Sequence, residues 1–585
     1  MKKISITAMI LIYTVVSIFA VFIGIEKIRE KYRAEDEIIA FYESGRTNLV
    51  IGDMLVKGYD QPLVSGGEIL LPFDLVKDLI DPTVYKEPDG SVVTVTSDDK
   101  VIRMRDGEVE AYVNMEQVRL DMTARYINRV LYIPIMVFRE IFGIEAAYLE
   151  EHDVVIIDFL KNYEHVGFVS PSVYQKTENN AGNPVGKARV MPESVAIRSG
   201  MSIKFPVYRE IGSEGEEVDV YEIDGEWARI RTSEGIIGYI ESRFLRSSVS
   251  YEGIVVDLIR RTPGEIEDIV LAWQYIYKTT PPVEDFMEYP QINVYSPTWF
   301  TVIASDGTME SRADYTYVNK VHEIGARIWP LLNNTFNDIE MTSAVLNNPE
   351  ARDNMIRQVL AYSQLYGFDG INMDFENIYL KDRDAYTQLI REMMPYARKM
   401  GIKISVDVGI PGGSDTYSLC YDHKRLSENA DYIMVMTYDQ FWASSPIAGS
   451  QAQLPWVEEM IERTLKYVHP EKLVMGIPFY TRIWRELDGT VRNINTVGID
   501  RAKKIVGEKN AVMEWDDASG QYYVYYEEEG AAYRMWLEDP RSIYLKAGLA
   551  VKYGLRGVAV WQLPLGNEDA WESIGKALSE RLVEQ

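Results

Sequence analysis

The chain has 585 residues, several times the length of a typical domain, so more than one hydrophobic core is expected. Hydrophobic residues make up 46% and charged residues 26%, which is the composition of a globular protein. The net charge of -28 argues against a nucleic-acid partner, because nothing would neutralise the phosphates. Cys420 is the single cysteine, which excludes an intramolecular disulfide, and the five histidines show no metal-ligand spacing. We therefore expect no cofactor and no metal.

The N-terminus carries a compartment signal. Lys2 and Lys3 precede an uncharged, mostly apolar run from residue 4 to residue 25, which is long enough to cross a bilayer as a helix. No small-residue cleavage site follows, so residues 1–35 are predicted to be an uncleaved membrane anchor, with a cleaved signal peptide as the alternative. Basic residues on both sides of the run leave its orientation open. We expect the rest of the chain to be extracytoplasmic because of the function inferred below, with a secreted form as the alternative.

Residues 36–160 contain two similar segments. Residues 69–80 and 131–142 each begin as a strand and continue into a helix that a proline introduces, and strand-like runs follow at 91–96 and 154–157. With this arrangement the region resembles the copper amine oxidase N-terminal domain that is common on bacterial surface proteins. The resemblance implies a small α+β domain that serves as a spacer or a wall-binding module. It implies no copper, because the region offers no ligand cluster.

Residues 161–185 are predicted to be a linker, because the stretch Asn179–Pro184 is rich in turn-forming residues. Residues 186–248 then alternate short apolar runs with glycines, a pattern that is typical of a small β-barrel. This region, with Trp227 in its central strand, resembles a bacterial SH3 domain, which implies binding to cell-wall peptides. The alternative is that Trp227 only fills the core.

From residue 266 to residue 583, apolar strands alternate with amphipathic helices, for example at 349–365 and 385–400. Such alternation indicates a parallel sheet buried on both faces, and eight strands fit a closed (β/α)8 TIM barrel. A Tyr-rich stretch at 521–526 predicts an α+β insertion before the last strand. The fold class is therefore multidomain, with a small α+β domain and a small SH3-like β-barrel before the TIM barrel. The strand candidates are 271–277, 292–300, 326–332, 370–375, 402–410, 432–438, 473–479 and 557–563.

The fourth predicted barrel strand carries the candidate chemistry. It reads Asp369-Gly-Ile-Asn-Met-Asp-Phe-Glu376, and the alternation of a strand turns residues 372, 374 and 376 to one side. That side is expected to face the barrel axis at the C-terminal mouth, where barrel active sites lie. Burying two carboxylates there is costly unless they have partners or a role. The alternative is an acidic turn that caps the following helix.

The fourth strand resembles the DGxDxDxE signature of family 18 glycoside hydrolases, the chitinase-like enzymes, with Asn372 at the first internal Asp. Met436-Thr-Tyr-Asp439 at the sixth strand resembles the Met-x-Tyr-Asp motif of this family. Trp561 lies at the eighth strand, where the family has a floor tryptophan. Together with Trp329-Pro-Leu-Leu-Asn-Asn334, the fourth strand is similar to the spore-germination and cortex-lytic branch.

This resemblance implies a retaining, substrate-assisted cleavage of β-1,4 linkages next to N-acetylglucosamine. Glu376 would protonate the glycosidic oxygen while the 2-acetamido carbonyl of the sugar attacks its own anomeric carbon. Asp374 would accept a hydrogen bond from the acetamide N–H and stabilise the positive charge that develops. Tyr438 would hold the acetamide oxygen, Asp439 would contact a sugar hydroxyl, and Trp561 would stack beneath the sugar.

The same motifs imply that Asn372, Asp369 and Met436 also belong to the substrate-binding residues. Asn372 is the departure from the family pattern, because two aspartates that lie together couple their titrations. With only an amide beside it, Asp374 is expected to ionise more readily, and the acid limb of the pH–rate profile is expected to be simple.

The predicted anchor, the SH3-like region and the cortex-lytic similarity favour peptidoglycan of the cell envelope or spore as the substrate. The expected partners are thus a glycan that contains N-acetylglucosamine, the cell wall and a membrane. One alternative is a chitinase that acts on chitin. Another is a lectin-like wall protein that binds glycan without cleaving it, although the presence of Glu376 favours an enzyme.

Overall fold

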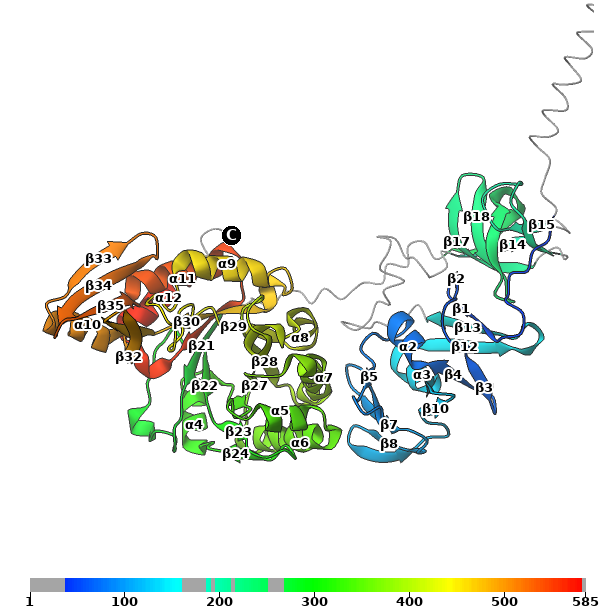
Figure 1. Ribbon diagram of the computed structural model, residues 1–585. Helices are drawn as coiled ribbons and strands as arrows, with labels where there is room; N and C mark the ends of the chain where they lie inside the picture. The colour runs from blue at the N-terminus through cyan, green and yellow to red at the C-terminus, as the bar shows by residue number, and fades with distance from the viewer. Residues whose placement is uncertain (1–36, 160–185, 191–194, 212–215, 251–267, 581–585) are drawn as a thin grey trace, which may run out of the picture. The chain divides into compact units, whose positions relative to one another are not determined.

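The structure, a computed structural model, describes five ranges of the chain that divide into two compact units (Figure 1). No helix within these ranges is long and apolar enough to cross a bilayer. The predicted anchor at residues 4–25 and the predicted linker at 161–185 lie outside the described residues. The described ranges are 37–159, 186–190, 195–211, 216–250 and 268–580. Among them, residues 85–103, 112–117 and 268–580 form the second unit, and the others form the first.

The two similar segments of the first unit fold alike. Strand β4 (Glu68–Pro72) leads into helix α2 (Phe73–Leu79), and β11 (Val130–Pro134) leads into α3 (Met136–Phe142). The strands β4 and β11 pair antiparallel, so the two segments share one sheet. A proline lies at each strand–helix junction, because it cannot supply the N–H that a longer ladder needs. The other strands of this part are β1 (Asn48–Ile51), β2 (Met54–Leu55), β3 (Leu63–Ser65), β10 (Arg125–Ile127), β12 (Ile144–Leu149) and β13 (Val154–Phe159).

Residues 186–250, where described, form a seven-stranded antiparallel sheet in the order β16-β15-β19-β18-β17-β14-β20. Its core is aliphatic, with Ile197, Ile230 and Ile240 fully buried, and Trp227 at the start of β18 is half-buried. The SH3-like assignment of this sheet stays a prediction. The strands are β14 (Gly186–Val190), β15 (Val195–Arg198), β16 (Val207–Ile211), β17 (Glu217–Asp224), β18 (Trp227–Arg231), β19 (Ile237–Glu241) and β20 (Leu245–Ser250).

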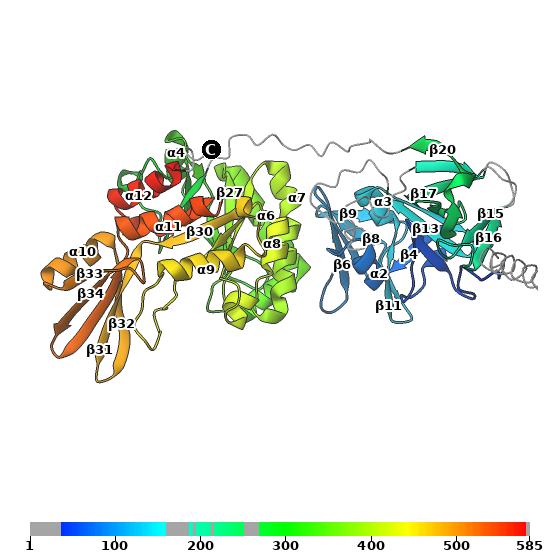
Figure 2. The same cartoon turned by 90° about the horizontal axis from the view of Figure 1, so that it is seen from above.

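The second unit contains the predicted parallel barrel (Figures 1 and 2). Strands β25 and β26 are two parts of its third strand, interrupted at Trp329–Pro330 because proline cannot donate to the ladder. The Trp329 N–H still donates to Tyr295 O at 2.9 Å, and Pro330 O accepts from the Asn372 N–H at 3.0 Å. This broken strand therefore pairs on both sides and closes the barrel. The barrel strands are β21 (Ile269–Gln274), β22 (Val294–Pro297), β25 (Arg327–Ile328), β26 (Leu331–Asn333), β27 (Gly370–Asp374), β28 (Lys403–Val408), β29 (Tyr432–Val435), β30 (Leu473–Pro478) and β36 (Gly557–Trp561), with β23 (Phe300–Val302) and β24 (Met309–Ser311) beside them.

Helices surround the barrel, and local sequence signals set their ends (Figure 2). Helix α6 (Pro349–Tyr366) begins after Asn348, whose side-chain oxygen accepts from the first free N–H groups of the helix. It ends at Gly367, which has a left-handed φ of 74° that favours glycine. The other helices are α4 (Tyr315–Glu323), α5 (Ile339–Leu346), α7 (Arg383–Met400), α8 (His423–Asn429), α9 (Leu454–Thr464), α11 (Pro540–Lys552) and α12 (Glu568–Ser579).

Buried ion pairs connect α6 and α7 to residues 85–103 of the same unit. Arg352 of α6 donates to the Glu392 carboxylate of α7 at 2.9 and 3.0 Å, and both side chains are fully buried. Arg352 also pairs with Glu87, and Arg103 pairs with Glu392 at 2.8 Å. Burial alone would raise the pKa of Glu392, but Arg103 and Arg352 outweigh it and lower this pKa to about 2. The neighbouring strands are β5 (Tyr85–Lys86), β6 (Val92–Thr96), β7 (Val101–Arg105), β8 (Glu110–Val113) and β9 (Glu116–Arg119), whose residues are divided between the two units.

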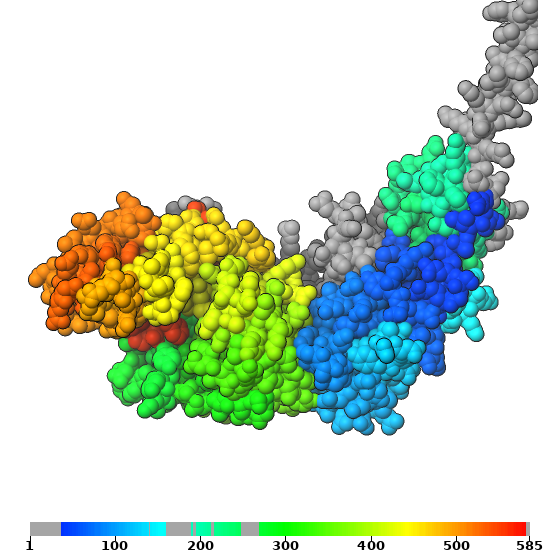
Figure 3. Space-filling view, in the orientation of Figure 1, coloured from blue at the N-terminus to red at the C-terminus, as the bar shows by residue number. Residues whose placement is uncertain are grey.

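Between β30 and α11 the chain forms the α+β insertion, a lobe of the second unit (orange in Figures 2 and 3). Its antiparallel sheet has the order β32-β31-β35-β34-β33. Ala502 and Ile505 of helix α10 pack with Val524 and Met535 of the sheet in a separate small core. The elements are β31 (Tyr480–Leu487), β32 (Thr490–Gly498), α10 (Ile499–Glu508), β33 (Val512–Asp516), β34 (Gln521–Glu528) and β35 (Ala531–Leu537).

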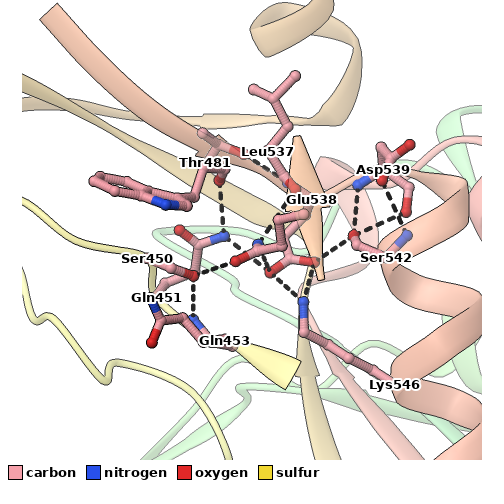
Figure 4. A network of polar contacts seen from close by, with 12 residues as sticks. Ser450, Gln451, Gln453, Thr481, Leu537, Glu538, Asp539, Ser542 and Lys546 are labelled. Atoms are coloured by element: carbon pink, nitrogen blue, oxygen red, sulfur yellow. Dashed lines mark hydrogen bonds and ion pairs between the residues drawn. The ribbon is translucent and has the colours of Figure 1, made fainter. Parts of the chain in front are cut away.

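A buried polar network joins this insertion to the barrel (Figure 4). The carboxylate of Glu538, just after β35, accepts from Lys546 of α11 at 2.8 and 2.7 Å, and both side chains are buried. Gln451, from the segment between β29 and α9, donates to the same carboxylate at 2.9 Å, and Ser542 donates at 3.0 Å. The Glu538 N–H donates to Thr481 of β31 at 3.1 Å. One carboxylate therefore connects α11, the β29–α9 segment and the insertion.

We expect Lys546→Met to lower the free energy of unfolding by about 3–5 kcal/mol, because it leaves the Glu538 charge buried and unpaired. Urea unfolding of the full chain, followed by tryptophan fluorescence, measures the loss. Lys504→Met is the matched control, since Lys504 pairs with Glu508 on the exposed face of α10 and such pairs contribute little. Equal losses in the two variants would contradict the role of this network.

Candidate active site

Strand β27 brings the predicted site residues to the C-terminal mouth of the barrel. On its outer face, Met373 and Phe375 belong to the core between barrel and helices, and Phe375 stacks on Tyr386 of α7 with ring centroids 5.5 Å apart. Alternation therefore turns Asn372 and Asp374 to the barrel interior. Asn372 is fully buried, and Asp374 is 6% exposed.

The main chain of Glu376 is held by a single side chain. Asn334, just after β26, donates to Glu376 O at 2.7 Å and accepts from the Glu376 N–H at 3.0 Å. Asn334 is buried and also donates to Thr342 of α5 at 2.9 Å, so its orientation is defined. The sequence did not predict this clamp, the pair of hydrogen bonds between Asn334 and the Glu376 main chain. Asn334 was noted only as part of a motif that resembles the cortex-lytic branch.

Glu376 has the protonation behaviour of an acid that works near neutral pH. Burial, and after it the charge of Asp439, raises the pKa of Glu376 to about 7. A carboxyl group with this pKa keeps its proton under mildly acidic conditions and can give it to a leaving group. The half-buried Glu376 side chain is thus suited to general acid catalysis.

The side chain of Asn372 is fully engaged inside the barrel. Its Oδ1 accepts from the indole N–H of Trp273 at 2.7 Å. Its Nδ2 donates to Asp407 Oδ1 at 2.7 Å and to Ser405 Oγ at 3.0 Å. Since Asn372 has no exposed surface, the prediction that it contacts the substrate is wrong. It instead connects Trp273 of β21 to the polar residues of β28.

Asp407 of β28 is a site carboxyl that sequence reasoning missed. It is 2% exposed, and burial raises its pKa well above the ordinary value, with Glu376 adding to the shift and the hydrogen bond from Asn372 opposing it. Burial, then Glu376 and Asp407, likewise raise the pKa of Asp374. The expectation of a lone amide neighbour is therefore wrong, and the expected simple acid limb stays a prediction. The available signal was Ser405 and Asp407, which alternate with the apolar residues of β28.

Asp369 belongs to the signature but not to the mouth. It precedes β27, and roughly 20 Å of extended chain separates it from Glu376. Its carboxylate contacts the His322 ring at 2.9 Å and accepts from the Ile328 N–H at 2.8 Å. The prediction that Asp369 binds substrate is wrong, because this carboxylate holds the start of the strand at the other end of the barrel.

Tyr438 and Asp439 follow β29 at the mouth. Burial, and then the nearby carboxyl groups, raise the pKa of Tyr438 well above its usual value, so its hydroxyl stays protonated and can donate. A Cβ at position 476 would lie 2.8 Å from the Tyr438 ring, so Gly476 makes room for it. Asp439 accepts hydrogen bonds from the Tyr480 hydroxyl and the Arg482 guanidinium, both on β31. The insertion thus supplies one wall of the site, which sequence reasoning did not predict.

Trp561 ends β36 beside the fully buried Trp273, with ring centroids 6.2 Å apart. It is half-buried, which leaves part of the indole at the mouth. Met436 is also half-buried, and its N–H donates to Val408 O at 3.0 Å. The predicted substrate contacts of Trp561 and Met436 stay predictions.

Exposed aromatic side chains follow several barrel strands on this face. Tyr277, after β21, is 72% exposed, and Trp442, between β29 and α9, is 53% exposed. Tyr275 and Tyr417, from the segments after β21 and β28, are similarly exposed. Segments that follow parallel barrel strands meet at the C-terminal face, so these rings surround the mouth. Within the described residues, no cluster of three or more His, Cys, Asp or Glu could hold a metal ion.

The fold and the acidic mouth define a barrel glycosidase, and comparisons with known proteins give its family. Residues 337–565 match the model of the glycosyl hydrolases family 18, and residues 51–157 match the copper amine oxidase N-terminal domain. The barrel region is therefore a family 18 glycoside hydrolase domain, preceded by a domain of the copper amine oxidase N-terminal type.

The curated relatives agree with this assignment. An uncharacterized glycosylase, YvbX, of Bacillus subtilis (strain 168) is 27% identical over 262 residues, which cover 43% of this chain and 74% of the relative. The cortical fragment-lytic enzyme of the same strain is 28% identical over 249 residues, or 41% of this chain and 57% of the relative. Di-N-acetylchitobiase of Rattus norvegicus is 28% identical over 242 residues, which cover 37% of this chain and 65% of the relative. The chain thus spans about 57% to 74% of the length of these relatives.

We expect Asn334→Ala to lower kcat/KM roughly 100-fold, because releasing the Glu376 main chain misplaces its carboxyl group. Initial rates on an N-acetylglucosamine oligomer measure the effect, and far-UV circular dichroism checks the fold. Asn354→Ala, on the outer helix α6, is the control and should keep the wild-type rate. A wild-type rate for Asn334→Ala would show that Glu376 does not need this clamp.

Proposed function

We propose that this protein is a retaining glycosidase that cleaves β-1,4 linkages of a polysaccharide containing N-acetylglucosamine, by substrate-assisted catalysis. The observation that carries the proposal is a proton donor with a pKa of about 7, Glu376, next to the buried carboxyl of Asp374. Asp374 Oδ1 is buried and has no hydrogen-bond partner. An acceptor left open in this way suits an N–H group that arrives with the substrate.

The proposed reaction uses the site in two steps. Glu376 gives its proton to the glycosidic oxygen, and the acetamide oxygen of the sugar attacks C1 as the leaving group departs. Asp374 accepts from the acetamide N–H of the resulting oxazolinium ion, and the neutral Tyr438 hydroxyl donates to the acetamide oxygen. Glu376 then takes a proton from water, which opens the oxazolinium ion from the opposite face. Two inversions at C1 retain the configuration.

Peptidoglycan, of the cell envelope or the spore cortex, is the substrate we propose. The relative named as a cortical fragment-lytic enzyme supports this choice. Chitin is the alternative, and the relative named as a chitobiase supports it. A lectin-like protein that binds glycan without cleaving it is disfavoured, because a binding site has no need of a proton donor at position 376. Digesting purified cortex peptidoglycan and chitin, with mass spectrometry of the products, decides between the substrates.

The remaining parts of the chain fit an enzyme that works at a surface. We propose that residues 1–35 anchor the protein in a membrane, with the barrel outside the cytoplasm. We further propose that residues 186–248 act as an SH3-like module that binds the cell wall. Residues 36–160 would then act as a spacer or a second wall-binding module. A fusion of residues 1–35 to a reporter, located by membrane fractionation, tests the anchor.

We expect kcat/KM to fall as the pH rises through about 7, because Glu376 acts as a donor only while it holds its proton. The elevated pKa keeps that proton up to this pH, so the alkaline limb of the profile falls through about pH 7. Glu376→Gln should reduce turnover by about 100-fold or more while oligosaccharide binding persists. Release of reducing ends and isothermal titration calorimetry measure the two quantities. Undiminished turnover in Glu376→Gln would refute the proposed donor.

We expect Trp442→Ala to weaken binding of long N-acetylglucosamine oligomers by about 2–10-fold, because an exposed indole stacks on a sugar face. Binding of the disaccharide should change less, since a short ligand need not reach this ring. Tyr467→Ala is the control, because Tyr467 is a similarly exposed aromatic residue between α9 and β30, at the opposite end of the barrel. Calorimetric titration of oligomers of increasing length measures both variants, and equal effects of the two would contradict stacking at the mouth.

A further inference from the structure

Three carboxyl groups occupy adjacent inward positions of two neighbouring strands. In the parallel pairing of β27 with β28, Asn372 lies opposite Ser405 and Met373 lies opposite Val406. The same register puts Asp374 at the level of Asp407, one strand spacing away, which is about 4.8 Å. Glu376 follows at the next inward position of its strand. Asp374 and Asp407 are therefore immediate neighbours inside a closed barrel.

The hydrogen bonds of Asn372 define which of its atoms faces Asp407. An indole N–H can only donate, so the atom that meets Trp273 Nε1 at 2.7 Å must be the amide oxygen. The amide nitrogen then faces β28, where it donates to Asp407 Oδ1 at 2.7 Å and to Ser405 Oγ at 3.0 Å. Both of its hydrogens are used. Asp407 thus receives a hydrogen bond that favours its anionic form, whereas Asp374 Oδ1 receives none.

Within the part of the chain that the structure describes, no basic side chain balances these carboxyl groups. Among the described residues, no Lys or Arg forms an ion pair with Asp374 or Asp407. The other titratable groups around the pair are acidic or neutral: Glu376 just after β27, Tyr438 after β29, Tyr386 on α7 and Tyr421 before α8. Two adjacent buried anions without a counter-charge repel strongly at low dielectric. The pair is therefore stable with one negative charge, and the hydrogen bond from Asn372 favours Asp407 as its carrier.

We propose that Asp407 is a positioning residue that carries the negative charge of this pair in the ligand-free enzyme and thereby keeps Asp374 protonated until a substrate arrives. This inference rests on the proposed function only for its catalytic consequence. A 2-acetamido sugar presents an N–H to Asp374, which must then be the anion, so binding shifts the ionisation of the pair toward Asp374. Asp407 thus makes the charge of Asp374 depend on whether the site holds a substrate.

The variant Asp407→Asn tests this role, because it removes the charge and keeps an oxygen that can accept from Asn372. We expect the acid limb of kcat/KM to move to higher pH by about one unit or more, since the single negative charge must then come from Asp374, which lacks the hydrogen bond that favours the anion of Asp407. Ser405→Ala is the matched control, because it removes another partner of Asn372 without changing charge, and its acid limb should coincide with that of the wild type. The double variant Asn372→Asp/Asp407→Asn places a carboxyl beside Asp374 again, now at position 372. It should restore the wild-type acid limb.

A second measurement does not depend on catalysis. A carboxyl whose pKa is raised on folding contributes stability at low pH that is lost as the pH rises through the raised pKa. Asp407→Asn lowers the pKa of Asp374 in the folded protein, so less stability should be lost than in the wild type as the pH rises from acid toward neutral. Urea unfolding of the full chain at several pH values, followed by tryptophan fluorescence, measures this difference, because Trp273, Trp299 and Trp329 are fully buried in the barrel.

The two measurements separate the two proposals. If no N-acetylglucosamine glycan is cleaved, the proposed function fails, and the unfolding experiment still judges Asp407. An acid limb and a pH dependence of stability in Asp407→Asn that both match the wild type would overturn the role of Asp407. A shift in either that Ser405→Ala reproduces would also overturn it, because the effect would then come from packing around Asn372 and not from charge.

Discussion

The constraint on which the site depends is the burial of several carboxyl groups in one closed, mostly apolar barrel. Such groups cannot all be ionised in a low-dielectric interior, so proximity itself determines which of them keep protons. The broken strand β25–β26 pairs with β22 and with β27 and so closes the barrel around these groups. The raised pKa values of Glu376 and Tyr438 therefore both follow from their positions inside the barrel.

The sequence predicts those features that lie within one strand. Alternation along β27 was enough to place Asp374 and Glu376 together, because a strand turns every second residue to the same face. The contact between Asn372 and Asp407 could not be predicted in this way, because it depends on the register between two strands. Asp369 shows that membership of the motif does not by itself predict a place in the site. Its carboxylate holds the start of the strand and lies away from the mouth.

The wall of the site that the insertion supplies was also beyond prediction from one sequence. The insertion itself could be recognised from its Tyr-rich stretch, but its orientation depends on contacts that no local pattern encodes. Asp439 meets Tyr480 and Arg482 because β31 starts two residues after β30 and continues past the mouth. The buried Glu538–Lys546 pair then holds the C-terminal end of the insertion against α11.

The hydrogen bond between the Glu538 N–H and Thr481 has a consequence for how this protein can diverge. It shows that the chain enters and leaves the insertion at neighbouring points on the barrel. Residues can therefore be gained or lost within the lobe without changing the spacing between β30 and β36. Evolution can resize this lobe, and with it the wall that it supplies to the site, as an independent module while the acidic centre stays intact.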